Sequence, residues 1–230
     1  MKIFYLWVSF SVPLCLCGET FVKLMKTLKF LLLLTLFLSL FACSQSAGNK
    51  SANKNAAVKK GVAPVADSEV AVIEMENGGA FGKITIELYS NIAPEAVKRF
   101  KELAREGVYN GTSFHRVNAM VVQGGDPLSK DANPDNDGTG KSDKPNVKAE
   151  FSDIPYDTGI VGAARSQDVD SANSQFFITL RRVPDFDNNY TIFGKVIDGM
   201  NNVKTIAGAP RNGERPLDDV KIKSVTIQSK

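Results

Sequence analysis

The stretch that decides the expected fold is residues 112–127, TSFHRVNAMVVQGGDP. It holds two short β-rich pieces, 112–117 and 120–124, and it ends in a glycine-rich turn. Gly124-Gly125-Asp126 is interpreted as a turn and not as a phosphate-binding loop, because neither the Lys-Ser/Thr pair nor the helix of such a loop follows it. Strands this short, separated by turn residues, are typical of all-β architectures.

The same texture continues on both sides of this stretch. Residues 84–88 alternate apolar and polar side chains, which is the period of a half-buried strand. A helix is predicted over 94–107, where Pro94 suits the first turn and Gly107 the C-terminal end. Further strands are predicted at 160–163, 175–179, 191–196 and 220–228, and a second short helix at 200–206. This pattern predicts a mainly β fold, a closed antiparallel β-barrel with helical caps.

Charge and cysteine content exclude several kinds of site. Residues 1–43 carry a formal charge of +3, which is the whole excess of the chain, and residues 67–230 carry −4. A mildly acidic domain is a poor match for a phosphate backbone, so no nucleic acid is expected as a partner. All three cysteines lie at or before Cys43, and His115 is the only histidine. We therefore expect neither a disulfide nor a metal site in the domain.

The N-terminal region, residues 1–42, is predicted to be a signal region. Its second apolar run, about 30–42, is shorter than the roughly 20 residues of a membrane-spanning helix and follows two lysines. It ends in Leu-Phe-Ala-Cys at 40–43, which resembles a bacterial lipobox, although Phe41 is bulkier than usual there. This resemblance implies that Cys43 is lipidated and begins the mature protein.

Met25 opens a complete signal of its own, so residues 1–24 are interpreted as the product of a start codon assigned too early, and 25–42 as the lipoprotein signal peptide. Two alternatives stay open: a plain signal peptide with a coincidental cysteine, and a pair of membrane-inserted helices. Residues 43–66 are predicted to be the lipidated cysteine and a flexible tether, because they contain almost no large apolar side chains. As a coil, the tether would span roughly 25 Å. The folded domain is predicted to be 67–230.

Three segments carry a family resemblance. The first segment runs from FHRV at 114–117 to QGGDP at 123–127, the second is SQFFI at 174–178, and the third is YTIFGKV at 190–196. Gly138-Thr139-Gly140 lies between the first and the second. In this order and at these separations they resemble the cyclophilin family of peptidyl-prolyl cis-trans isomerases over about 70–228. The resemblance implies a single closed eight-stranded antiparallel β-barrel capped by two α-helices.

The resemblance also implies an active site. Arg116 matches the arginine that contacts the prolyl amide, Gln123 the glutamine that hydrogen-bonds the substrate backbone, and Phe177 the floor of the proline pocket. Because side chains alternate along a strand, Phe176 is expected to point the other way, into the core. The other expected substrate-binding residues are Met120, Val121, Gly138, Ala164, Arg165, Gln175, Phe186 and Tyr190.

The implied reaction is a rotation about an X–Pro bond, which breaks no covalent bond. It therefore needs no cofactor, nucleophile or general base, only weakening of an amide resonance that sets a barrier of about 18–20 kcal/mol. His115 is accordingly expected to be a hydrogen-bonded structural residue and not a catalytic base.

The chain departs from the family pattern in the pocket wall. It is one residue shorter between Arg116 and Gln123, which puts Met120 where the family usually has phenylalanine and Val121 where it has methionine. Asp185 stands where cyclosporin-sensitive members carry tryptophan, and Tyr190 replaces a frequent histidine. We expect an active enzyme with a less tightly walled pocket.

Two other function classes remain open. One is a peptide-binding module or holdase that keeps the groove without useful catalysis, and the other is a structural lipoprotein of the envelope. The expected partners are proline-containing polypeptides and a membrane reached through the lipid anchor at Cys43, with the chain a monomer. The expected location is the periplasmic face of a bacterial envelope. The outer membrane is favoured because Ser44 is not the aspartate that often retains lipoproteins at the inner one.

Overall fold

The computed structural model describes residues 57–230, so the predictions for 1–56, which include the signal region and Cys43, lie outside the described residues. One sheet of eight strands dominates the described part, and every neighbouring pair of strands is antiparallel. In spatial order the strands are β10 (Ile222–Ser229), β1 (Glu69–Met75), β2 (Lys83–Leu88), β7 (Ile192–Asp198), β5 (Ile160–Ala163), β6 (Phe176–Thr179), β4 (Val121–Gly124) and β3 (Arg116–Val117).

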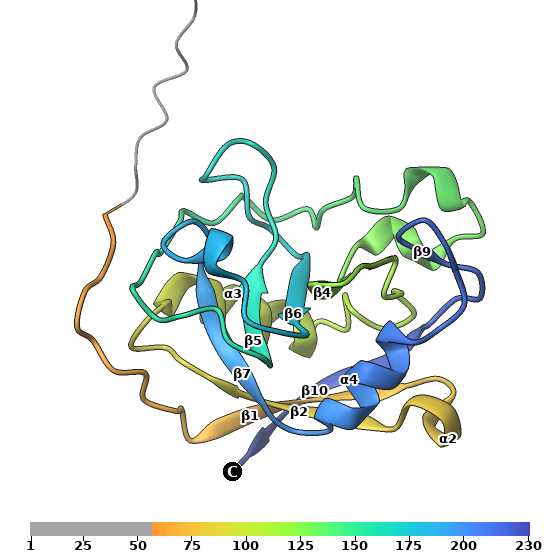
Figure 1. Cartoon of the computed structure of the whole chain (residues 1–230), viewed down its shortest axis with the longest axis horizontal. Helices are drawn as coiled ribbons and strands as arrows, with labels where there is room; N and C mark the ends of the chain where they lie inside the picture. Colours follow the sequence, from red (N-terminus) through yellow and green to blue (C-terminus); the bar gives the residue numbers. More distant parts are fainter. Residues whose placement is uncertain (1–56) are drawn as a thin grey trace, which may run out of the picture. The chain divides into compact units, whose positions relative to one another are not determined.

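The sheet is strongly curled (Figure 1), and backbone hydrogen bonds join the segments at its two ends. The edge strands β3 and β10 do not form a continuous ladder with each other. Instead, residues 111–114, which precede β3, are joined to residues 220–222 around the start of β10. Gly111 N–H donates to Ile222 O, Ile222 N–H to Thr112 O, and Phe114 N–H to Val220 O, at 2.7 to 3.0 Å. The prediction of a mainly β, eight-stranded antiparallel barrel is confirmed, with a strongly curled sheet in place of a fully hydrogen-bonded cylinder.

Two helices pack against this sheet, as predicted. Helix α3 (Pro94–Arg105) has proline in its first turn and buries one face against β7 and β10. Helix α4 (Met200–Ala207) buries Val203 and Ile206 beside β2 and β4. A further single turn, α2 (Gly78–Phe81), and three 3₁₀ turns, η1 (Pro127–Lys130), η2 (Pro134–Asn136) and η3 (Pro184–Phe186), were not predicted.

The alternation of β6 divides the interior into two apolar clusters. Phe176 belongs to the main core, where it meets Phe100 and Tyr109 edge to face at 5.5 and 5.8 Å. Phe177 points to the other side and joins a smaller cluster with Tyr156 and Val121. The predicted opposite orientation of the two phenylalanines is therefore confirmed, and the smaller cluster lies under the candidate site.

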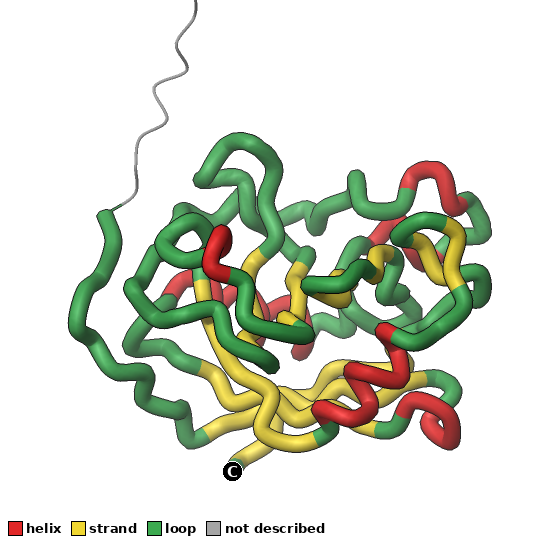
Figure 2. The backbone as a smooth tube through the Cα atoms, viewed as in Figure 1, coloured by secondary structure: helices red, strands yellow, loops and turns green. Residues whose placement is uncertain are grey.

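Other predicted boundaries were wrong. The strand expected over 112–117 is reduced to β3, because residues 112–114 turn away to meet 220–222. Strand β1 and the hairpin of β8 (Arg211–Asn212) and β9 (Arg215–Pro216) were not among the predicted strands. Much of the remaining chain is loop, including all of 137–159 (Figure 2).

Residues 57–66, predicted to be part of a free tether, lie against the domain. Lys59 N–H donates to Phe151 O at 2.8 Å, and Asp153 N–H donates to Lys59 O at 3.1 Å. The Lys59 ammonium also donates to Ile92 O at 2.6 Å. The composition of this segment favours a coil, but backbone hydrogen bonds fix it against the domain, and Ala66 at its end packs on the smaller apolar cluster. Within residues 57–230, no helix combines the length and the apolar character that crossing a membrane requires.

Candidate active site

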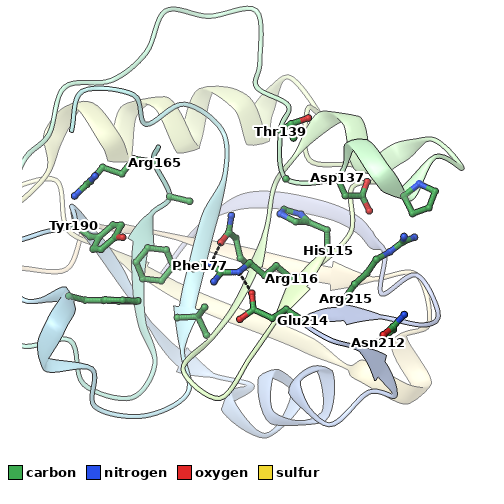
Figure 3. Close-up of a pocket in the computed structure, with 16 residues that line it drawn as sticks. His115, Arg116, Asp137, Thr139, Arg165, Phe177, Tyr190, Asn212, Glu214 and Arg215 are labelled. Atoms are coloured by element: carbon green, nitrogen blue, oxygen red, sulfur yellow. Dashed lines mark hydrogen bonds and ion pairs between the residues drawn. The ribbon is translucent and has the colours of Figure 1, made fainter. Parts of the chain in front are cut away.

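A cavity of about 460 Å³ opens beside strands β3, β4 and β6. Loops 134–139 and 186–190 and the β8–β9 hairpin complete its walls. Figure 3 shows the Phe177 and Tyr190 rings, with Arg165 beside them, on one side of this cavity, and Asp137, Arg215 and Glu214 on the other, with Arg116 between the two groups. The site is therefore assembled from segments far apart in the sequence, and it has an apolar half and a polar half.

The apolar half is floored by Phe177, which is only 4% exposed. Its ring stacks on Tyr156 at 5.8 Å and meets Phe186 and Tyr190 edge to face at 5.4 and 5.6 Å. Gly162 makes this position possible, since a Cβ there would lie 2.4 Å from Cζ of Phe177. Rings packed edge to face stabilise one another, so the pocket is held open by its own walls.

The polar half is a chain of hydrogen bonds. An Nη1 N–H of Arg116 donates to Oε1 of Gln123 at 3.2 Å, and the Gln123 amide NH₂ donates to Oε1 of Gln175 at 2.9 Å. The Gln175 NH₂ in turn donates to the carbonyl oxygens of Gly138 and Gly140 at 3.0 and 2.8 Å. We call these four links the glutamine relay. It runs from the cation to the loop at the cavity rim.

Asp126 fixes the loop at the cavity rim through hydrogen bonds to its backbone. Its carboxylate is fully buried and accepts backbone N–H bonds from Leu128, Gly138 and Gly140. Gly140 must be glycine, because a Cβ there would lie 2.0 Å from Oδ1 of Asp126. The position of the relay therefore depends on the turn that follows β4.

Arg116 has a second partner that the sequence did not indicate. Its Nε–H donates to Oε2 of Glu214 at 2.6 Å, and Asn118 Nδ2 donates to Oε1 of the same carboxylate at 2.9 Å. The hydrogen bond from Arg116 holds the pKa of Glu214 below its usual range. Glu214 lies in the turn of the β8–β9 hairpin, which had no recognisable motif.

His115 lines the cavity but makes no hydrogen bond to any described residue. It is 7% exposed, and both ring nitrogens lack a partner within the part of the chain that the structure describes. Burial lowers its pKa from the ordinary value of 6.5. The prediction of a hydrogen-bonded structural histidine was therefore wrong about the hydrogen bonds, although the ring is buried in the cavity wall.

A second groove of about 410 Å³ adjoins the cavity and shares five lining residues with it: Gln123, Gly138, Thr139, Ala164 and Arg165. Its side chains are hydroxyls, amides and the two cations Lys141 and Arg165, without a carboxylate. Arg165 is oriented by the Tyr190 ring, 4.7 Å from its guanidinium carbon, and by Asn189 O at 2.9 Å. The cavity and the second groove therefore form one continuous hollow.

The structure gathers most of the predicted site residues. The cavity is lined by Arg116, Val121, Gln123, Gly138, Ala164, Arg165, Phe177, Phe186 and Tyr190. Gln175 lines the second groove, whereas Met120 lines neither and packs at the edge of the smaller apolar cluster. Sequence reasoning missed Tyr156 under the floor and, among the residues that line the cavity, Pro134, Asp137, Asn212, Glu214 and Arg215.

The arrangement suits noncovalent chemistry. In residues 57–230 no three His, Cys, Asp or Glu side chains are close enough together to hold a metal ion. A fixed guanidinium beside an apolar pocket can bind a small ring and direct N–H donors at its amide.

Comparison with known proteins places these observations in a family. The family model for cyclophilin type peptidyl-prolyl cis-trans isomerases matches residues 72–227. A probable peptidyl-prolyl cis-trans isomerase of Brucella suis is 44% identical over 130 residues, which are 54% of this chain and 66% of that protein, just under two thirds. The peptidyl-prolyl cis-trans isomerase cypE of Dictyostelium discoideum is 38% identical over 63% of this chain and 91% of its own length.

Solved structures agree with the sequence matches. A crystal structure of a Cryptosporidium parvum cyclophilin type peptidyl-prolyl cis-trans isomerase, determined in the presence of the dipeptide Ala-Pro, superposes with a TM-score of 0.62. It is 30% identical and covers 70% of this chain and 99% of its own. On its curled eight-stranded sheet and on these matches, the chain belongs to the cyclophilin-type peptidyl-prolyl cis-trans isomerase family.

Proposed function

We propose that this chain accelerates the cis-trans isomerisation of X–Pro bonds in exported polypeptides, as a monomer without a cofactor. One observation carries the proposal: the Arg116 guanidinium stands beside a pocket floored by the buried Phe177 ring. The similar Cryptosporidium protein was crystallised with Ala-Pro, a dipeptide of the matching chemistry.

The apolar half would hold the proline ring. Three ring methylenes buried against Phe177 and Phe186 contribute about 2 kcal/mol, at roughly 0.8 kcal/mol for each. This contact is the same for cis, trans and twisted amides, so it provides affinity without discrimination. It also fixes the ring while the other side of the bond rotates.

The polar half would provide the rate. Twisting the amide removes its resonance and concentrates electron density on the prolyl nitrogen, where a guanidinium N–H can donate. A hydrogen bond from a charged donor is worth about 1.5–3 kcal/mol, and only the part that exists solely in the twisted form lowers the barrier. Gln123 and Gln175 would hold the flanking backbone so that only this bond turns.

The experiment compares Arg116→Ala, Arg116→Lys and Phe177→Ala in the purified full-length protein. Exchange NMR on a proline peptide gives the affinity and the isomerisation rate separately. Arg116→Ala should lower kcat and kcat/KM together by about a hundredfold, or about 3 kcal/mol, with affinity nearly unchanged. Arg116→Lys should recover part of the rate, because it keeps the charge but loses the planar fork. Phe177→Ala should weaken binding of both isomers.

A matched control is Arg105→Ala. Arg105 is also an exposed arginine with a carboxylate partner, Glu69 at 2.8 Å, but it does not line the cavity. It should leave the rate unchanged. If the unaltered protein binds the peptide without accelerating its exchange, the chain is a holdase. If Arg116→Ala weakens binding as much as it slows exchange, the arginine is an anchor and the electrostatic account fails.

The proposal includes export and a lipid anchor at Cys43. Its support is the Leu-Phe-Ala-Cys pattern at 40–43 after a basic, apolar signal. Several acyl chains hold a protein firmly at a membrane, whereas one chain does so marginally. Intact-mass analysis of the protein from its host should show a lipidated N-terminus at Cys43, and Cys43→Ser should abolish it. An unmodified N-terminus in the unaltered protein would refute the anchor.

A structural lipoprotein would give a different result in the host. Arg116→Ala would then leave the phenotype of a deletion strain fully complemented. If the chain acts as an isomerase in the envelope, the same variant should fail to complement while it is still exported to the same amount.

A further inference from the structure

Glu214 contacts β3, the strand that carries Arg116, through both its backbone and its side chain. Its backbone carbonyl accepts the N–H of Val117 at 2.6 Å, which docks the hairpin turn onto β3. Its carboxylate then bridges Arg116 and Asn118, whose side chains share a face because they are two residues apart. Glu214 is thus held in place independently of Arg116, and it can orient that side chain.

The contact uses a particular edge of the guanidinium. Glu214 takes Nε–H and Gln123 takes one N–H of Nη1, and within residues 57–230 no acceptor hydrogen-bonds Nη2. The Arg116 side chain is 44% exposed and would otherwise sample many rotamers. Figure 3 shows Arg116 between the Phe177 ring and the Glu214 carboxylate, with hydrogen bonds to Glu214 and to Gln123. The free donors are those a bound peptide would meet.

We propose that Glu214 is a positioning residue, which holds the Arg116 fork so that its free N–H groups face the proline pocket. The inference rests on the proposed function, in which Arg116 acts on the prolyl amide. An exposed ion pair by itself contributes little to stability, so the effect belongs to the reaction and not to the fold. The pKa of Glu214 is lowered because the hydrogen bond from Arg116 favours the ionised carboxylate, which agrees with this contact.

The two possible roles of Glu214, to orient Arg116 or to neutralise its charge, predict opposite changes in the isomerisation rate. If Glu214 mainly positions Arg116, its removal slows the reaction, and Glu214→Gln recovers much of the rate because an amide oxygen can still accept from Nε–H. If it mainly neutralises Arg116, removing the negative charge strengthens the pull on the amide and raises the rate. We expect the first outcome, with Glu214→Ala lowering kcat about fivefold and leaving peptide affinity unchanged.

The test is exchange NMR on the full-length protein, with the ¹⁵Nε–¹Hε signal of Arg116 as a second readout. In the unaltered protein and in Glu214→Gln this N–H should exchange slowly with water, whereas in Glu214→Ala it should broaden or disappear. Glu74→Ala is the matched control, because it removes an ion pair of the same 2.6 Å length, with Lys83, outside the cavity. It should change neither readout.

A double-mutant cycle separates this inference from the proposed function. In an Arg116→Ala background, Glu214→Ala should have no further effect on the rate. If Arg116→Ala alone is silent, the proposed mechanism fails. If Arg116→Ala slows exchange but Glu214→Ala does not, or speeds it, the mechanism stands and the positioning role of Glu214 is refuted.

Discussion

Replacing Gly162 by alanine would place a methyl group directly under the pocket floor. The new Cβ would lie 2.4 Å from Cζ and 2.9 Å from Cε2 of Phe177, and 2.7 Å from the Tyr156 hydroxyl. Carbon atoms in contact are separated by about 3.5–4.0 Å, so the Phe177 ring must move by about 1 Å. Because the Gly162 backbone needs no left-handed conformation, this contact is the only source of strain.

The ring has little room to move. Phe177 is enclosed by Tyr156, Phe186 and Tyr190, so the displacement passes into the cavity and makes it shallower. Overpacking of this kind costs about 1–3 kcal/mol of folding free energy. If a similar amount is lost from contact with a proline ring, peptide affinity falls by about tenfold or more, at 1.4 kcal/mol per decade.

Urea denaturation and NMR titration with a proline peptide measure the two effects on one sample. Gly79→Ala is the control, because nothing lies within 4 Å of the added methyl in α2. Gly162→Ala should lose both stability and affinity while the isomerisation rate of the bound peptide changes little. If it instead binds the peptide as tightly as the unaltered protein, the Phe177 ring is not the floor of the peptide site.

Three further predictions concern other parts of the domain. Burial lowers the pKa of His115, the only histidine, so below about pH 6.5 the unfolded chain binds a proton that the folded domain does not. The free energy of unfolding should therefore fall from pH 7 to pH 5, by at most about 1.4 kcal/mol per pH unit. In urea titrations, His115→Gln should remove this part of the pH dependence. Asp185 is exposed at η3 and offers no apolar surface, so isomerase assays should show weak cyclosporin inhibition that Asp185→Trp partly restores; tight inhibition of the unaltered protein would contradict this. Glu150 accepts the backbone N–H groups of Glu95 and Ala96 at the start of α3. Glu150→Ala should therefore cost about 1 kcal/mol of unfolding free energy in the same denaturation experiment, and an unchanged free energy would contradict this capping role.

The sequence predicted those features that local patterns determine. Strand β5 was predicted with its observed bounds, and the opposite orientations of Phe176 and Phe177 follow from the two-residue period of a strand. The strand expected over 112–117 was too long, because its first half is paired across the barrel with 220–222. The strand propensity of residues 112–114 does not indicate that they pair with 220–222, because this pairing depends on the closure of the sheet.

In the site, too, the residues in recognisable local segments could be predicted and those brought in by long-range contacts could not. Arg116, Gln123 and Phe177 could be located because they lie in recognisable segments on adjoining strands. Glu214, 98 residues from Arg116 along the chain, lies in a short hairpin with no motif, and no local pattern connects the two. Residues 57–66 were assigned to the tether for a related reason, since hydrogen bonds from Lys59 to distant carbonyls have no compositional signature.

The glutamine relay has a direction that its two ends impose. The carbonyls of Gly138 and Gly140 can only accept, so the amide nitrogen of Gln175 must face them and its oxygen must face Gln123. A guanidinium can only donate, so the oxygen of Gln123 must face Arg116. Neither amide can flip without leaving two donors or two acceptors opposed. The Asp126 carboxylate accepts the N–H groups of Gly138 and Gly140 and so keeps the carbonyls of these two residues in place. The turn after β4 therefore helps to set which atom each glutamine presents along the groove.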